Sequence, residues 1–152
     1  GTTTEFMAEI LRNRPQLMVV TNSVTLATMI AESSTQVFML GGRVRATTLS
    51  AVGSKTVDEL ASYRAQIAFL GTNGIDLESG FTTVDPDEAA VKRVMIENST
   101  ETILLADNSK FGANYSALFA GFEEIDRIVT DVDAHPSHVE ELTEKGIEVV
   151  LA

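Results

Sequence analysis

The 152-residue sequence has no cysteine, no tryptophan and no long hydrophobic run. Without cysteine, the chain has no disulfide, no thiolate nucleophile and no cysteine-ligated metal. No apolar run approaches the ~20 residues that a membrane-spanning helix needs, so we expect no membrane partner. No basic segment followed by an apolar one marks the chain for secretion. Together these absences favour a cytoplasmic protein.

Basic residues are also scarce, since 11 lysines and arginines stand against 22 acidic residues and leave a net charge of −11. A protein that binds nucleic acid through its own surface normally has a basic face, because neutralised phosphates supply most of the affinity. The basic residues here form no run. We therefore expect that this chain alone does not bind DNA, and that a few local cations and backbone N–H groups would hold any anionic ligand.

The sequence does contain a regular alternation of apolar runs with helical patterns. With 44% apolar residues, we expect one domain over residues 1–152 that buries a substantial core. The alternation predicts an α/β fold with a doubly wound, mostly parallel sheet flanked by helices. The expected strands are residues 17–20, 37–40, 67–70, 102–106, 125–129 and 147–151, and the expected helices are 5–12, 24–32, 54–63, one that starts after residue 85 and one that starts near residue 137.

Three of the expected helices carry a capping signal at their start. Ser23 is the expected N-cap of the second helix, and Asp85, with Glu88 three residues later, is the expected N-cap of the fourth. Ser137 and Glu140 have the spacing of a capping box for the last helix.

Polar clusters follow four of the predicted strands, at residues 21–23, 41–43, 72–74 and 107–110. The second cluster contains two glycines, which permit either a tight turn or the close approach of backbone to a ligand. In parallel sheets, small molecules bind outside the carboxyl ends of the strands. One cluster would indicate no more than a turn, but four predict a small-molecule site at this edge. Residues 71–84 are expected to form a loop that lines it.

Asp85, Glu88 and Lys92 are spaced at i, i+3 and i+7 and therefore share one face of the fourth helix. One interpretation is a cap followed by an exposed Glu–Lys pair, which contributes only a few tenths of a kcal/mol. The other interpretation is that Lys92 faces the strand ends and contacts an anion or a sugar oxygen. Lys110, three residues after Asp107, has the same two interpretations.

A hydroxyl-rich tract opens the first helix at residues 1–4. It is either a frayed terminus with threonine caps or an anion cradle, because free N–H groups and the helix dipole point at a ligand there. His135 and His138 are the only histidines, and without a third ligand at metal spacing we expect a surface position and no metal site. No phosphate-binding or dinucleotide-binding glycine motif is present, so we expect no cofactor.

Seven motifs occur in order along the chain: GTTT at residues 1–4, VTNS at 20–23, LGG at 40–42, FLGTNG at 69–74, GFTT at 80–83, EAAVKR at 88–93 and LADNSKFG at 105–112. With these motifs the chain resembles the C-terminal effector-sensing domain of DeoR/GlpR-type transcriptional repressors, over essentially its whole length. Seven motifs in the right order make a far more specific match than any one of them.

The resemblance implies a fold similar to ribose-5-phosphate isomerase and glucosamine-6-phosphate deaminase, a sugar-phosphate effector and a homo-oligomer. It also implies that the Gly-Thr-Thr-Thr segment cradles the phosphate, and that Asn73, Lys92, Asp107 and Lys110 face the sugar. Members of the family begin with a winged helix-turn-helix that binds DNA. We therefore expect DNA binding only through an N-terminal domain that is not in this chain, and the strand expected before the GTTT motif is absent from it as well.

Asn73 separates two functional hypotheses. The related isomerases carry an acidic pair at this point, whereas an amide cannot shuttle the proton that isomerisation needs. We therefore expect a non-enzymatic sensor that belongs to a transcriptional regulator of sugar metabolism, with no catalytic residues. The rival hypothesis is a sugar-phosphate isomerase or deaminase in which Glu88 or Asp85 acts as the base and Lys92 polarises a carbonyl.

The predicted ligand site collects the strand-end clusters, the start of the first helix and the charged face of the fourth. Its members are Gly1, Thr2, Thr3, Thr4, Thr21, Asn22, Ser23, Gly41, Gly42, Arg43, Thr72, Asn73, Gly74, Asp85, Glu88, Lys92, Asp107 and Lys110. The sequence does not select the sugar, because phosphorylated hexoses and pentoses need similar donors.

Overall fold

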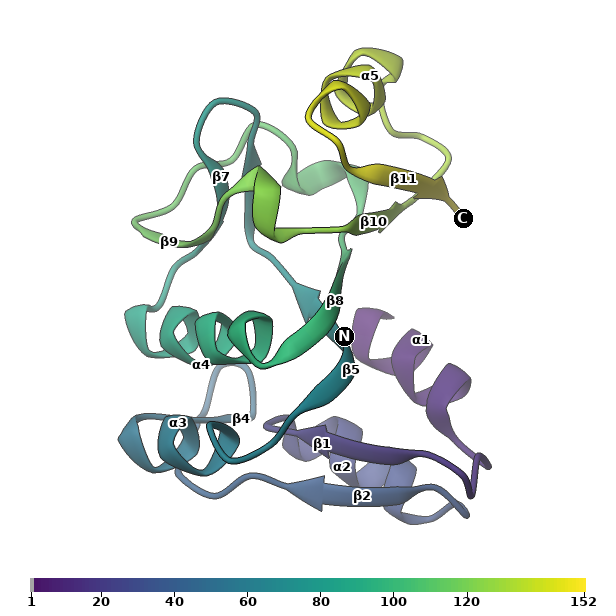
Figure 1. The fold of residues 1–152 in the computed structure, drawn as a ribbon, viewed down its shortest axis with the longest axis vertical. Helices are drawn as coiled ribbons and strands as arrows, with labels where there is room; N and C mark the ends of the chain where they lie inside the picture. The colour runs from purple at the N-terminus through teal and green to yellow at the C-terminus, as the bar shows by residue number, and fades with distance from the viewer. Residues whose placement is uncertain (1) are drawn as a thin grey trace. The chain divides into compact units, whose positions relative to one another are not determined.

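The computed structural model describes residues 2–152, with Thr2 described in its backbone alone. Gly1 of the predicted site lies outside the described residues. The chain divides into two compact units, Gly1–Ser62 and Tyr63–Ala152, which run from purple to blue and from teal to yellow in Figure 1. Both units contain helices and parallel strands.

The first unit is built around two parallel strands joined by a helix. Its elements are α1 (Thr2–Leu11), β1 (Met18–Thr21), α2 (Val24–Ala31), β2 (Gln36–Met39), β3 (Arg43–Arg45), β4 (Ser50–Val52) and α3 (Ser54–Leu60). In the β1–β2 pair, Met18 lies opposite Gln36 and Thr21 opposite Met39, so the two strands end together. β3 and β4 form an antiparallel hairpin.

The second unit is built on a four-stranded parallel sheet with the order β11-β10-β8-β5. Its elements are β5 (Ala65–Gly71), β6 (Gly74–Asp76), β7 (Gly80–Thr83), α4 (Pro86–Glu97), β8 (Ser99–Leu105), η1 (Asn108–Lys110), β9 (Ala117–Ala120), η2 (Phe122–Glu124), β10 (Arg127–Thr130), α5 (Pro136–Glu144) and β11 (Glu148–Leu151). α4 contacts β8 and β9, and α5 contacts β11 (Figure 1). These elements confirm the predicted α/β class with a mostly parallel sheet flanked by helices.

Burial of these apolar runs differs between the strands. The last four residues of β8 are all buried, and so are Ala68 and Leu70 of β5. Each predicted strand is present, with its ends displaced by up to three residues. The core of the second unit is formed by Leu70, Ile75, Phe81, Ala89, Ile96, Leu104, Ala106, Phe119, Ala120, Ile125, Ile128, Leu142 and Ile147.

The loop expected over residues 71–84 is wrong in part. β6 and β7 form an antiparallel hairpin within it, and β9 pairs with β7 on the other side. Ile75 and Phe81 of this hairpin are fully buried, so the segment contributes to the core. Its strands have three and four residues and begin at Gly74 and Gly80, which is too short for a clear two-residue period.

The helix starts at Ser23 and Asp85 agree with the sequence in position. Ser23 Oγ accepts a hydrogen bond from Leu26 N at 3.1 Å, which confirms Ser23 as the N-cap of α2. Asp85 is the N-cap residue of α4, but its side chain does not accept the capping hydrogen bond, so that part of the prediction is wrong.

The capping box predicted at Ser137 and Glu140 is also wrong. His135 is the N-cap of α5, and its Nδ1 accepts a hydrogen bond from Ser137 N at 3.1 Å. Pro136 occupies the first helical position, where its missing N–H costs nothing, and so the cap falls on the residue before it.

Candidate functional site

Two of the predicted polar clusters meet at one edge of the second unit's sheet. Gly71 of β5 lies opposite Leu105 of β8, so these two parallel strands end side by side. Residues 72–74 follow the first strand and residues 107–110 follow the second. The structure therefore brings these two clusters together at the carboxyl ends of neighbouring strands, where α/β sheets bind small molecules.

The residues after β5 use most of their polar groups inside the unit. Thr72 Oγ1 contacts the carbonyl oxygens of Gly74 and Thr82 at 2.9 and 3.0 Å. Asn73 N donates to Thr82 O at 3.1 Å, and Asn73 Oδ1 accepts from Thr83 Oγ1 at 2.5 Å. Within the described part of the chain, the amide NH2 of Asn73 has no acceptor. It is therefore a donor that a ligand oxygen can use.

Lys92 reaches the same edge from α4. Its Nζ donates to the carbonyl of Gly71 at 2.6 Å and lies 5.1 Å from the centre of the Phe119 ring. Burial of the ammonium lowers the pKa of Lys92 from 10.5 to about 8, and the charge of Glu88 opposes this change. Lys92 thus faces the strand ends, while its contact with a ligand stays a prediction.

Asp85 and Glu88 lie earlier on the same helix. Both are half-buried, and Glu88 stands one turn before Lys92, close enough for its charge to act on the ammonium. The Glu–Lys pair of the first interpretation therefore exists as an electrostatic interaction. It is not a fully solvated surface pair, because Lys92 is half-buried and desolvation lowers the pKa of its ammonium.

Asp107 organises the loop after β8. As N-cap of η1, it accepts hydrogen bonds through Oδ1 from Ser109 N at 2.8 Å and from the Ser109 hydroxyl. The hydroxyl contact, followed by the Ser109 N–H and the charge of Lys110, lowers the pKa of Asp107 against the effect of its partial burial. The half-buried Lys110 side chain has no hydrogen bond or ion pair to any described residue.

Asp131 joins this edge and is not among the predicted site residues. Its carboxylate accepts hydrogen bonds from Asn108 N at 3.0 Å and from Asn108 Nδ2 at 2.9 Å. It follows β10, the next parallel strand, in which Val129 lies opposite Leu105. The signal that could have found it is its place directly after a predicted strand, the same signal that selects Asp107.

In the first unit, the predicted residues after β1 hold the fold together. Thr21 Oγ1 accepts from Ser23 N at 3.0 Å, and Ser23 caps α2. Asn22 Nδ2 donates to the Ala51 carbonyl at 3.0 Å, and the Asn22 carbonyl accepts from Ala51 N at 2.7 Å. These contacts explain the cluster in structural terms, and a ligand role for it stays a prediction.

The glycines after β2 meet α3. Gly41 N donates to Glu59 Oε1 at 3.0 Å, and Gly41 O accepts from Thr56 Oγ1 at 2.6 Å. Gly42 has a φ of +137°, and a Cβ there would clash with Thr56, so this position requires glycine. Next to it, an open hollow of about 490 Å3 is lined by Gly42, Arg43, Val52, Gly53, Ser54 and Lys55.

Thr2, Thr3 and Thr4 form the first turn of the ten-residue helix α1. Thr3 is exposed and Thr4 is half-buried. The hydroxyl-rich tract therefore opens a helix, which is the arrangement that an anion cradle needs.

Comparison with known families identifies the family of this chain. The family described as DeoR C terminal sensor domain matches residues 1–132. The chain belongs to this family.

Relatives of this DeoR-type sensor domain are transcriptional regulators. The HTH-type transcriptional regulator GlpR of Haloferax volcanii is 37% identical over 150 residues, which cover 99% of this chain and 59% of that protein. The glycerol-3-phosphate regulon repressor of Escherichia coli is 32% identical over 152 residues, covering 99% and 60%. The HTH-type transcriptional repressor GlcR of Bacillus subtilis is 31% identical, covering 99% and 58%. The chain thus spans about three fifths of the length of these relatives.

The chemistry at the sheet edge of this DeoR-type domain suits the binding of a polar anion. Asn73, Lys92 and Lys110 supply donors, and Asp107 supplies an acceptor for a hydroxyl. In residues 2–152, no group of three or more His, Cys, Asp or Glu side chains could hold a metal ion. Of the helices described, none is both long and apolar enough to cross a membrane.

Proposed function

We propose that this chain is the ligand-sensing domain of a DNA-binding transcriptional regulator of sugar metabolism, and that its ligand is a phosphorylated sugar. The relatives named as transcriptional regulators and regulon repressors support the regulatory part. DNA binding would reside in residues outside this chain, and the protein would be a cytoplasmic homo-oligomer. The ligand changes repression if it binds two conformations of the protein with different affinity.

The observation that carries the proposal is the position of Lys92. An ammonium at the end of a parallel strand that is partly withdrawn from water and hydrogen-bonded to one carbonyl would gain a charged partner from a phosphate oxygen. Asn73 and Lys110 add donors at the same edge. Thr3 and Thr4 at the start of α1 are the proposed phosphate contacts.

Calorimetric titration with phosphorylated hexoses and pentoses, and with their unphosphorylated counterparts, tests the proposal. We expect at least one phosphorylated sugar to bind and its unphosphorylated form to bind far more weakly. If no phosphorylated sugar binds to the folded protein, the proposal is wrong.

Variants then locate the ligand. Lys92→Ala should weaken binding roughly 10- to 100-fold, which corresponds to one hydrogen bond to a charged group, and Thr3→Ala should also weaken it. Lys145→Ala is the matched control, because Lys145 likewise lies 4.8 Å from an aromatic ring, that of Phe122, but precedes β11 at the opposite edge of the sheet. If Lys92→Ala and Lys145→Ala bind the sugar phosphate with equal affinity, Lys92 is not part of the site.

The lowered pKa of Lys92 is the one observation that favours a second candidate, a sugar-phosphate isomerase or deaminase. An amine with a pKa of about 8 exchanges its proton near neutral pH, and Glu88 or Asp85 would then serve as the base. Turnover of ribose 5-phosphate or of an amino-sugar phosphate that Glu88→Gln abolishes would establish it. Asn73 in place of an acid and the regulators among the relatives favour the sensor.

A further inference from the structure

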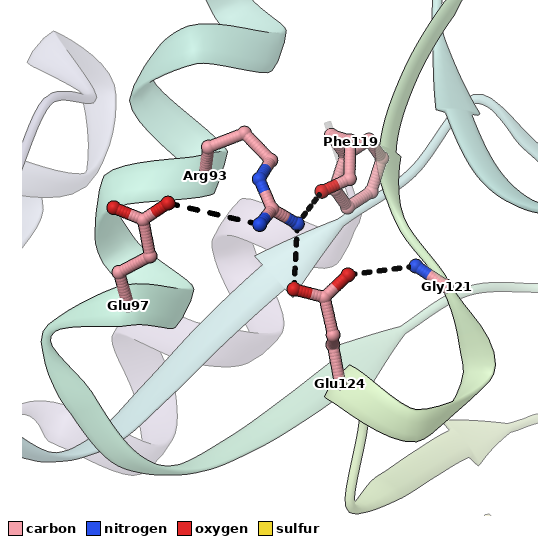
Figure 2. Close-up of polar contacts among 5 residues, drawn as sticks. All are labelled: Arg93, Glu97, Phe119, Gly121 and Glu124. Carbon is pink, nitrogen blue, oxygen red and sulfur yellow. Dashed lines mark hydrogen bonds and ion pairs between the residues drawn. The ribbon is translucent and has the colours of Figure 1, made fainter.

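Two adjacent residues of α4 hold the same residue of β9. Lys92 lies over the ring of Phe119, 5.1 Å from its centre, and Arg93 Nη1 donates to the Phe119 carbonyl at 2.7 Å. Phe119 itself is fully buried in the core. The ring that flanks the Lys92 ammonium is therefore located by the backbone hydrogen bond that Arg93 makes (Figure 2).

Glu124 closes a second connection to this segment. Its Oε2 accepts from the same Arg93 nitrogen at 2.7 Å, and its Oε1 accepts from Gly121 N at 3.0 Å (Figure 2). Gly121 follows β9 directly. Arg93 therefore connects α4 to Phe119 near the end of β9, and through Glu124 to the turn that begins at Gly121. Burial raises the pKa of Glu124, but the hydrogen bonds from Gly121 and Arg93 and the Arg93 charge outweigh it and lower the pKa overall.

Glu97 is the second acidic partner of Arg93 and differs in every relevant respect. It lies 3.7 Å from Arg93 Nη2, its side chain is 59% exposed against 28% for Glu124, and it stands on α4 itself. An exposed i,i+4 pair of this kind contributes little and connects α4 to nothing else. Glu97 is therefore a natural control for Glu124.

We propose that Arg93 and Glu124 are positioning residues for Lys92: they fix α4 against β9 so that the Phe119 ring shields the Lys92 ammonium at the end of β5. Neither residue needs to touch the ligand. That the location of the Lys92 ammonium matters for sensing rests on the proposed function. That Arg93 and Glu124 fix this location is a property of the protein without ligand.

Lysine Nζ titration by NMR tests the proposal, because the chain has only four lysines, at positions 55, 92, 110 and 145. Glu124→Ala should raise the pKa of Lys92 by about one unit or more, since loss of the connection exposes the ammonium to water. Simple electrostatics predicts the opposite sign, because removing a negative charge lowers the pKa of a nearby ammonium. Glu124→Gln keeps only one of the two acceptor oxygens and should therefore raise the pKa less than Glu124→Ala does. Glu97→Ala should leave the pKa near its original value.

A Lys92 pKa that stays constant or falls in folded Glu124→Ala would overturn the proposal. If that variant does not fold, Glu124→Asp, which keeps the charge but withdraws the carboxylate by one methylene, should show the same rise. Sugar-phosphate affinity is measured separately on the same variants. Absence of any binding to the original protein counts against the proposed function alone, because the lysine titration requires no ligand.

Discussion

At Lys92, desolvation of the ammonium reduces the stability of the fold, whereas the proposed ligand binding requires the charge. The Lys92 ammonium donates to the Gly71 carbonyl and lies beside the Phe119 ring, where desolvation lowers its pKa. Because folding lowers the pKa from 10.5 to about 8, only the unfolded chain still holds this proton between those two values. The free energy of unfolding therefore rises with pH across that window, and below it the buried charge reduces stability.

We predict that Lys92→Met abolishes this pH dependence. Methionine keeps the aliphatic stem without the charge, so the variant should be more stable than the original protein at pH 7, by about 1–3 kcal/mol. It should at the same time lose sugar-phosphate affinity. Urea unfolding from pH 7 to pH 10 measures the difference, which should shrink as the pH rises above about 8.

Lys145→Met is the control for this series, because Lys145 also lies over an aromatic ring but is exposed. Its stability difference from the original protein should not change over the same pH window. If the Lys92→Met difference were equally constant, the Lys92 ammonium would not be buried in solution.

At the scale of elements, the β6–β7 hairpin carries Asn73 and depends on a close backbone approach. A Cβ at Gly74 would clash with the carbonyl of Ala113 and with Thr82 Oγ1, whereas one at Gly71 would meet nothing within 4 Å. The two glycines lie three residues apart and therefore form a matched pair.

We predict that Gly74→Ala lowers the free energy of unfolding by about 2 kcal/mol, because the clash involves backbone that cannot move freely. Gly71→Ala should change it by no more than about 0.5 kcal/mol. Thermal or urea unfolding of both variants makes the comparison. Similar losses in the two would contradict the hairpin geometry at Gly74.

The start of α5 provides a second test at this scale, because sequence and structure assign the cap to different residues. We predict that His135→Ala costs about 1 kcal/mol of stability, since His135 Nδ1 accepts the Ser137 N–H, and that His135→Asn recovers most of it. Ser137→Ala should cost less. The reverse order in urea unfolding would restore Ser137 as the cap.

At the scale of the whole molecule, the net charge of −11 opposes binding to a polyanion. We predict that the 152-residue chain does not bind duplex DNA even at about 50 mM salt, where any electrostatic binding is strongest. Fluorescence anisotropy with a labelled duplex measures this, with a basic DNA-binding protein as positive control. Binding that weakens steeply with added salt would contradict the prediction.

Prediction from the sequence succeeded where the signal is local. These parallel strands coincide with short continuous apolar runs, so β5, β8 and β11 are found within up to three residues of their ends. It failed at β6, β7 and β9, which are too short for a clear period. β6 and β7 form a local hairpin, whereas β9 pairs with β7 from a distant part of the chain. The cap of α5 failed for a smaller reason, because Ser137 has a good cap side chain but Pro136 shifts the helix start.

The amino-acid sequence by itself determined the α/β class, the family and the clusters at the strand ends, because periodicity, composition and ordered motifs are properties of the chain before it folds. Only the tertiary structure decided what those residues face. It showed that Thr21 to Ser23 make hydrogen bonds within their own unit, that Asp131 joins Asp107 at the sheet edge, and that Lys92 faces the strand ends with its ammonium partly desolvated. The environment of Lys92 comes from Gly71, Glu88 and Phe119, and no spacing along the chain reports a neighbour such as Phe119, 27 residues away on another strand.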